Sequence, residues 1–210
     1  MRHFAVIALL LVAAVLGTSA ADTDASRAAA LLRQAAGNAT TLSCSFEQTR
    51  TSSMLASPST SAGTLSFSRP GLMRWEYRTP YSYAFVLNGD SILTTDGTRS
   101  NLINTRSNKL FARIVGLMSK AISGDIEGSR ADFDTAVEAH DAVMVITLTP
   151  RRRELKHVLR DIVLTVDSTT GLARNLTLHE RNGDVTDITF RDHRLNVPVD
   201  PVLFRLTPVK

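Results

Sequence analysis

The chain has little of what crosslinks or catalyses in small proteins. Its 210 residues include one cysteine, Cys44, which excludes a disulfide within the chain and leaves the fold dependent on its core. There is no G-x-S-x-G, H-E-x-x-H or C-x-x-C motif and no glycine-rich phosphate loop. We therefore predict a protein that is not an enzyme and uses no cofactor or metal, and we interpret Cys44 as a small buried residue.

Neither sign of charge is in large excess. Lysine and arginine total 24 and aspartate and glutamate 20, which leaves a formal charge of +4 and no basic stripe interleaved with aromatics. This balance favours acidic partners weakly and gives no reason to expect nucleic acid. We interpret the triplet Arg151, Arg152 and Arg153 as a solvated turn, with contact to phosphate or membrane as the alternative.

Long hydrophobic runs are also scarce, with one exception at the N-terminus. Residues 4–16 are apolar, about 13 residues against the roughly 20 that span a bilayer. Arg2 and His3 precede this run, and the small residues 18–20 follow it, which predicts a signal peptide over residues 1–21. No cysteine follows the cleavage point, so we expect residues 22–210 to form one unanchored domain in an oxidising compartment.

Most of the remaining chain alternates apolar and polar residues with the period of a β-strand. Residues 63–77, GTLSFSRPGLMRWEY, predict two strands around a Pro-Gly turn. Residues 52–62 predict a flexible connection and residues 96–108 a polar stretch. Nine to eleven antiparallel strands are expected in all, the others over residues 41–51, 83–87, 91–95, 143–149, 159–167, 172–180, 185–191 and 202–206.

Two helices are predicted, over residues 25–36 and 109–124. In the second, Leu110, Ile114, Leu117 and Met118 recur at helical spacing and form an apolar stripe. Most strands have one apolar face, which fits a curved sheet with one apolar and one wet side. Such a sheet must be covered, and the stripe of residues 109–124 is the candidate cover. We predict a mainly β protein, a curved sheet covered by helices.

Three motifs occur in order along the chain. They are F-x-Q at residues 46–48, G-x-L-x-F-x-R-P-x-L-x-R-W-x-Y at residues 63–77, and G-D-x-T-x-I-x-F with a later Asn at residues 183–196. Together they resemble the outer-membrane lipoprotein carrier family (LolA). The resemblance implies an incomplete antiparallel β-barrel closed by helices over an apolar cavity. It also implies a periplasmic carrier of acylated lipoproteins, from an inner-membrane ABC exporter to an outer-membrane receptor; we expect a monomer.

Arg69 is the unusual residue of the second motif. Alternation places it on the face of Leu65 and Phe67, where a charge is costly unless it is paired. The resemblance implies that Arg69 hydrogen-bonds backbone carbonyls of a lid helix and holds the cavity shut until cargo enters.

The cavity predicted from these patterns has nine lining residues: Phe46, Leu65, Phe67, Met73, Trp75, Leu110, Ile114, Leu117 and Met118. Two alternatives remain open. The same residues could form an ordinary closed core, with Arg69 a strand-end charge that reaches water. The fold could also serve a periplasmic sensor or binding module for acylated or glycolipid ligands.

Overall fold

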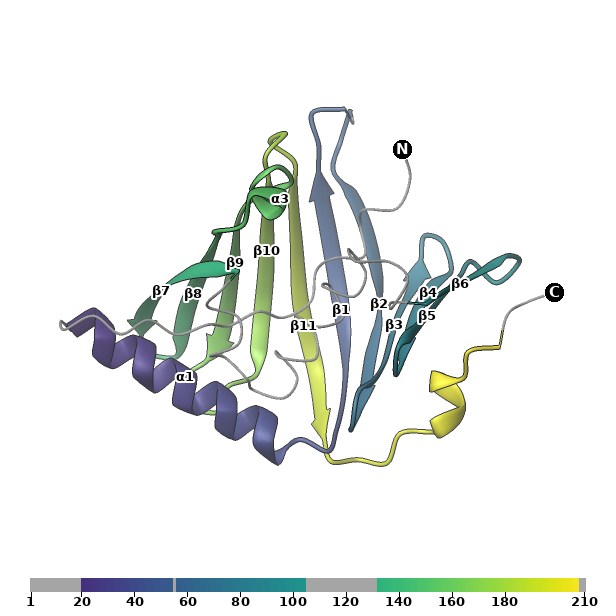
Figure 1. The fold of residues 1–210 in the computed structure, drawn as a ribbon, viewed down its shortest axis with the longest axis horizontal. Helices are drawn as coiled ribbons and strands as arrows, with labels where there is room; N and C mark the ends of the chain where they lie inside the picture. The colour runs from purple at the N-terminus through teal and green to yellow at the C-terminus, as the bar shows by residue number, and fades with distance from the viewer. Residues whose placement is uncertain (1–19, 55, 105–131, 208–210) are drawn as a thin grey trace.

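The structure, a computed structural model, describes residues 20–54, 56–104 and 132–207, and over these residues the protein is mainly β. Eleven strands form one antiparallel sheet in the order β6-β5-β4-β3-β2-β1-β11-β10-β9-β8-β7 (Figure 1). The strands are β1 Thr41–Thr51, β2 Ser59–Ser68, β3 Leu72–Thr79, β4 Tyr83–Asn88, β5 Ser91–Thr95, β6 Ser100–Asn104, β7 Phe133–His140, β8 Val143–Pro150, β9 Leu159–Asp167, β10 Ala173–Glu180 and β11 Val185–Leu195.

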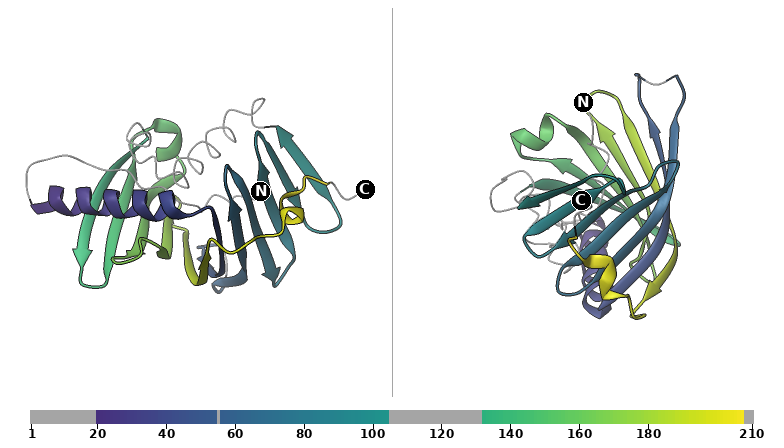
Figure 2. Two further views of the ribbon diagram at one scale, coloured as in Figure 1. Left: turned by 90° about the horizontal axis from the view of Figure 1, so that it is seen from below. Right: turned by 90° about the vertical axis from the view of Figure 1, so that its right-hand side faces the viewer.

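The sheet consists of two runs of consecutive hairpins joined in the middle. Strands β1 to β6 pair in sequence, as do β7 to β11, and β1 pairs with β11. The strands predicted over residues 83–87 and 91–95 are confirmed as β4 and β5, and the turn between them has Gly89 at a φ of 58°, a conformation that glycine adopts without steric cost. Strands β6 and β7 are edges and do not pair with each other, so the strongly curved sheet is open rather than a closed barrel (Figure 2).

The two faces of the sheet are packed differently. We call inner face the one whose side chains join Ala28 of the helix α1 (Ala20–Asn38) in a single apolar cluster. This cluster draws on both halves of the sheet, with members such as Phe46, Met73, Ile146 and Leu164. On the other face the 3-10 helix η3 (Pro201–Phe204) lies against β3 and β4 and buries Phe204. The predicted range of nine to eleven strands includes the observed eleven, but the predicted wet face does not hold at β4 and β5, where Val86 and Leu93 are buried outside the inner cluster.

Helix α1 lies across the ends of strands in the β7 half of the sheet (Figure 1). Besides Ala28, its Leu31 and Leu32 pack against the core. Gly171, in the β9–β10 turn, permits close approach, since a Cβ there would lie 2.9 Å from the Ala35 Cβ and the residue has a φ of +70°. In the described part of the chain no helix is both long and apolar enough to cross a membrane.

The prediction that helices cover the sheet is not supported. Among the described residues α1 is the one long helix, and it packs against the β7 half. Residues 109–124, the predicted cover with Leu110, Ile114, Leu117 and Met118, lie outside the described residues.

The C-terminal strand predicted over residues 202–206 was wrong, because η3 stands there. The Asp200 side chain accepts a hydrogen bond from the Val202 amide, and Pro201 opens the turn. A capping aspartate followed by proline favours helix initiation over strand pairing. The turn that results brings Phe204 to a buried position.

Four further elements differ from the prediction, and in β2 and β6 strand pairing outweighs composition. Strand β2 begins at Ser59, because its serine-rich start pairs with β1 as far as Arg50. The polar segment Ser100–Asn104 forms the edge strand β6, which pairs on one side with β5. The strand β7 was not predicted, and the predicted basic turn includes one turn of helix, α3 (Arg153–Lys156).

Candidate functional site

Five of the nine predicted lining residues lie together on the inner face of β1, β2 and β3. Register places Leu65 opposite Trp75 and Phe67 opposite Met73, and directly paired residues point to the same face. Phe46 stands on β1 within contact of Trp75. All five are buried, between 1% and 5% exposed. The other four, Leu110, Ile114, Leu117 and Met118, belong to the segment outside the described residues.

Aromatic rings form the middle of this surface. The Phe46 and Trp75 ring centroids are 4.4 Å apart, and Tyr77 and Phe190 meet these rings edge-on. Gly63 makes room for them, since a Cβ there would lie 2.8 Å from the Phe46 ring and 1.8 Å from the Glu76 carbonyl oxygen. Tyr77 and Phe190 were not predicted as site residues, although their period-2 spacing from Trp75 and Ile188 carried the signal.

The aromatic group contains one satisfied polar side chain and one unsatisfied one. The Tyr77 hydroxyl donates to the Gln48 side-chain oxygen at 2.9 Å, which pairs the buried glutamine of F-x-Q. Burial raises the pKa of Tyr77 to about 12. The Trp75 indole nitrogen Nε1 is buried and has no hydrogen-bond partner.

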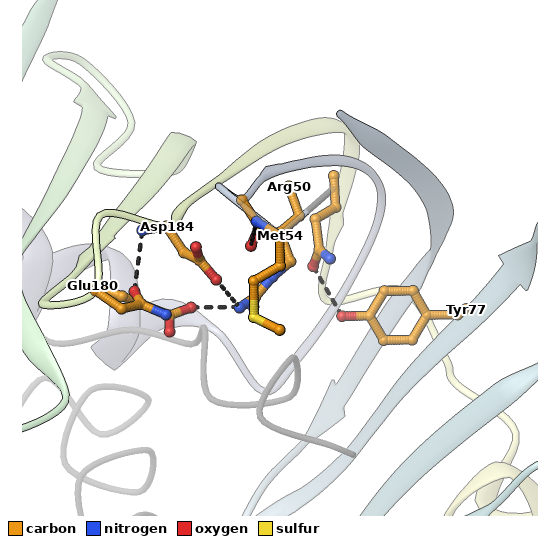
Figure 3. Close-up of polar contacts among 8 residues, drawn as sticks. Arg50, Met54, Tyr77, Glu180 and Asp184 are labelled. Atoms are coloured by element: carbon orange, nitrogen blue, oxygen red, sulfur yellow. Dashed lines mark hydrogen bonds and ion pairs between the residues drawn. The ribbon is translucent and has the colours of Figure 1, made fainter. Parts of the chain in front are cut away.

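Beyond Gln48 along β1, the inner face becomes charged. Arg50 contacts Glu180 at 3.0 Å and Asp184 at 2.7 Å, and both carboxylates come from the β10–β11 hairpin. Figure 3 shows Arg50 facing these two residues, with Tyr77 further along the sheet. Burial opposes ionisation of Asp184, but hydrogen bonds from Ser52 and Arg50 outweigh it and hold the pKa of this carboxyl below its usual value.

Arg69 follows the last residue of β2, and its side chain is exposed rather than buried among Leu65 and Phe67. Its guanidinium Nε donates to the Ala39 carbonyl oxygen at 2.8 Å, and its backbone amide donates to the Thr40 carbonyl oxygen at 2.9 Å. Its observed partner is thus the chain that leaves α1, where helix carbonyls lack intrahelical donors. The predicted contact with a lid helix over residues 109–124 falls outside the described residues.

Asn196, the last residue of the third motif, binds the same connection. Its side-chain oxygen accepts from the Thr40 amide at 2.8 Å and from the Thr40 hydroxyl at 2.9 Å. Its side-chain nitrogen donates to the carbonyl of Asn38, the last residue of α1, at 2.9 Å. Its backbone amide donates to the Thr41 carbonyl. Arg69 of the second motif and Asn196 of the third are 127 residues apart in sequence (196 − 69), and both bind the junction between α1 and β1.

Acidic groups near the start of β7 contact the basic triplet. Arg152 forms an ion pair with Asp132, and Arg151 lies 3.4 Å from Asp134. The Arg151 amide also donates to the Asp132 carbonyl at 2.8 Å. These contacts give Arg151 and Arg152 a structural role in joining β7 to the end of β8.

Cys44 is a buried thiol of low reactivity. Cys44 is buried, and burial, followed by the charge of Asp192, raises the pKa of its thiol to about 12. A thiol that stays protonated is a poor nucleophile, as the prediction of a small buried residue requires. Across the described ranges no three His, Cys, Asp or Glu side chains are grouped to hold a metal ion.

Fold and site together define a protein with an open antiparallel sheet, whose apolar inner face passes into a charged cluster at one end of β1. Residues 37–207 match the model of the family "Outer membrane lipoprotein carrier protein LolA", and the chain belongs to this family. This is a family of carriers, not of enzymes.

Individual relatives extend over most of the chain. An outer-membrane lipoprotein carrier protein of Pseudomonas paraeruginosa is 28% identical over 196 residues, which cover 93% of this chain and 91% of the relative. One of Nitrosospira multiformis is 29% identical over 175 residues, covering 81% and 80%. Among solved structures, a LolA superfamily protein from Nitrosomonas europaea matches with a TM-score of 0.43 and 12% identity, over 85% of this chain and 97% of that one.

Proposed function

We propose that this protein carries lipoproteins by holding their acyl chains against the inner face of the sheet. The observation that supports this most is the row of buried apolar side chains on the inner face of β1, β2 and β3, in a sheet that stays open between β6 and β7. Each buried CH₂ group of an acyl chain contributes about 0.8 kcal/mol, so cargo with several chains needs such a surface to stay in water.

The proposal extends to the cavity and its cover. Leu110, Ile114, Leu117 and Met118 would complete the lining from a helix over residues 109–124, opposite Phe46, Leu65, Phe67, Met73 and Trp75. Residues 1–21 would be removed on export, which leaves residues 22–210 as a single domain that acts in the periplasm as a monomer. It would receive lipoproteins from the inner-membrane ABC exporter and deliver them to the outer-membrane receptor.

Release requires that the empty state compete with the loaded one. In the proposal Arg69 is a latch that favours the empty, closed state by hydrogen bonding to backbone carbonyls, of which Ala39 is the observed example. A charged hydrogen bond of this kind is worth roughly 1.5–3 kcal/mol. Cargo with several acyl chains can outcompete a latch of that size, whereas a fully packed core would not open.

The direct test is to keep a lipoprotein soluble without detergent. We would mix the exported form with a triacylated lipoprotein, remove the detergent, and separate the products by size-exclusion chromatography. A soluble one-to-one complex is expected, and the same lipoprotein lacking its acylated cysteine should elute alone. Aggregation of the acylated cargo as if no carrier were present would refute the proposal, and loss of its acyl groups would indicate an enzyme instead.

A further inference from the structure

We propose that the indole N–H of Trp75 donates a hydrogen bond to the carbonyl oxygen of a bound acyl ester or amide, and so sets the depth at which an acyl chain binds. The inference rests on the proposed function, because it names the part of the ligand that this surface recognises.

The observation behind it is an unpaired donor in an apolar environment. Trp75 is 5% exposed, and its Nε1 has no hydrogen-bond partner. The rings of Phe46 and Phe190, with centroids 4.4 Å and 6.0 Å from that of Trp75, offer no hydrogen-bond acceptor. Buried polar groups are nearly always paired, and an unpaired one lowers stability until a partner arrives.

Tyr77 is the protein group that competes for this donor. Burial has the largest effect on the pKa of Tyr77 and raises it, while the Trp75 N–H acts in the lowering direction. The indole group is therefore close to the phenol, but the two groups do not meet hydrogen-bond geometry. The Tyr77 hydroxyl instead donates its hydrogen bond to the Gln48 side-chain oxygen at 2.9 Å. Trp75 stays available for an acceptor on a ligand.

The chemistry of the donor and its surroundings selects the acceptor. An indole N–H can only donate, so its partner must be an acceptor. An anionic head group placed among these rings would lose its hydration without a cation to replace it. A neutral ester or amide carbonyl attached to a hydrocarbon chain meets both conditions.

The order of side chains along β1 gives the ligand a direction. Phe46, Gln48 and Arg50 follow each other on the same face, so the surface passes from hydrocarbon to amide to charge. Trp75 contacts Phe46, just before this transition. A carbonyl held there would place the acyl tail on the apolar side and the lipid's polar end toward Arg50.

Because Trp75 is the only tryptophan of the chain, indole fluorescence reports on the environment of this residue alone. We would titrate the exported form with methyl palmitate and with hexadecyl methyl ether, which has a similar chain but no carbonyl. The ester is expected to bind about 3- to 10-fold more tightly, the gain of one net hydrogen bond, and to shift the emission to longer wavelength. The ether should bind without that shift.

Two variants test whether Trp75 causes the preference for the ester over the ether. Binding would be measured by displacement of an apolar dye. Trp75→Phe keeps an aromatic ring and should bind both ligands with nearly equal affinity. Tyr77→Phe removes the competing oxygen and should retain the preference for the ester. An ester preference that survives in Trp75→Phe, or equal affinities and no spectral shift in the wild type, would overturn the inference while leaving the carrier intact. If neither ligand binds the wild type, the proposed function itself fails.

Discussion

The polar side chains on the inner face need hydrogen-bond or ion-pair partners, because they lie next to buried apolar residues. Gln48 and Arg50 alternate with the strand period and so share a face with Phe46, where an unpaired amide or guanidinium would be costly. Each has a partner from a distant strand, Tyr77 for Gln48 and the pair Glu180 and Asp184 for Arg50. These partners allow the charged end of β1 to remain part of a folded, largely apolar surface.

Asp184→Asn should lower the free energy of unfolding by about 1–3 kcal/mol at pH 7, since it weakens a largely buried charged hydrogen bond to Arg50. The folded-state pKa of Asp184 is lowered, so its stabilisation is complete above its unfolded pKa of about 3.9 and is lost as pH falls through the folded value. Urea unfolding at a series of pH values should therefore show the gap between variant and wild type closing in acid.

The matched control for this experiment is Glu47→Gln, on the same strand. Glu47 lies 3.5 Å from Arg191, and both side chains are more than half exposed. Surface pairs of this kind contribute little, so the free energy of unfolding should change by less than about 1 kcal/mol. A gap for Asp184→Asn that stays constant from pH 7 to pH 3 would contradict the assignment of the lowered pKa.

At the scale of elements, the junction of α1 and β1 holds the helix against the sheet. Asn196 supplies four hydrogen bonds to residues 38–41, and Arg69 supplies two more. Because the last carbonyls of a helix lack intrahelical donors, these side chains act as a C-terminal cap from outside the helix. The orientation of α1 therefore depends on β2 and β11 as well as on its own packing.

Asn196→Gly tests the contribution of the Asn196 side chain to this junction without changing the backbone conformation. Asn196 has a φ of 58°, which glycine accepts without strain, so the variant removes mainly the side-chain hydrogen bonds. We expect a loss of about 1–3 kcal/mol in the free energy of unfolding and faster hydrogen exchange of the α1 amides.

Asn175→Ala is the control, since Asn175 bonds to Asp187 on β11 and not to α1. It should lower overall stability without a selective effect on α1 exchange. If Asn196→Gly left the exchange of α1 unchanged relative to the strands, the side chain would not be what holds the helix.

At the scale of the whole molecule, the open sheet would allow cargo to bind and leave without any strand being unfolded. Within the described residues β6 and β7 are the two edges of the sheet and do not pair with each other, so these strands do not close it into a barrel. In the proposed carrier, closure depends on a few hydrogen bonds from the Arg69 latch to backbone carbonyls of the lid. Binding and release then differ by the free energy of these contacts rather than by refolding of the sheet.

Arg69→Leu should accept lipoprotein but deliver it poorly. Loss of a latch worth roughly 1.5–3 kcal/mol disfavours the closed, empty state, so cargo should be held about 10- to 150-fold more tightly. Transfer to the outer-membrane receptor, followed by fractionation over time, should slow accordingly.

Arg74→Leu is the comparison for this variant, because Arg74 also donates to a backbone carbonyl, that of Leu203, but at η3 on the opposite face. We expect it to deliver cargo normally. Normal delivery by Arg69→Leu would count against the latch, and equal defects in both variants would point to general destabilisation.

Most features that depend on neighbouring residues were predicted correctly, whereas features that depend on contacts distant in sequence were not. Strand alternation is local, so the inner-face positions of Leu65, Phe67, Met73 and Trp75 could be read from residues two apart. The edge strand β6 could not, because its polar residues are held by pairing with β5 rather than by burial of an apolar face. Residues 201–204 were misassigned because a capping aspartate and a proline outweighed an apolar pattern.

By itself the sequence determined the class of fold and the apolar face, since these follow from which residues alternate along each strand. It did not determine the partners. Asn196 meets Thr40 across 156 positions, Arg50 meets Asp184 across 134, and Arg69 reaches Ala39 past the end of β2. Only the tertiary structure decided these contacts, because the pairing of β1 with both β11 and β2 brings residues that are distant in sequence side by side. The burial of the Trp75 indole nitrogen without a hydrogen-bond partner is likewise visible only in the tertiary structure.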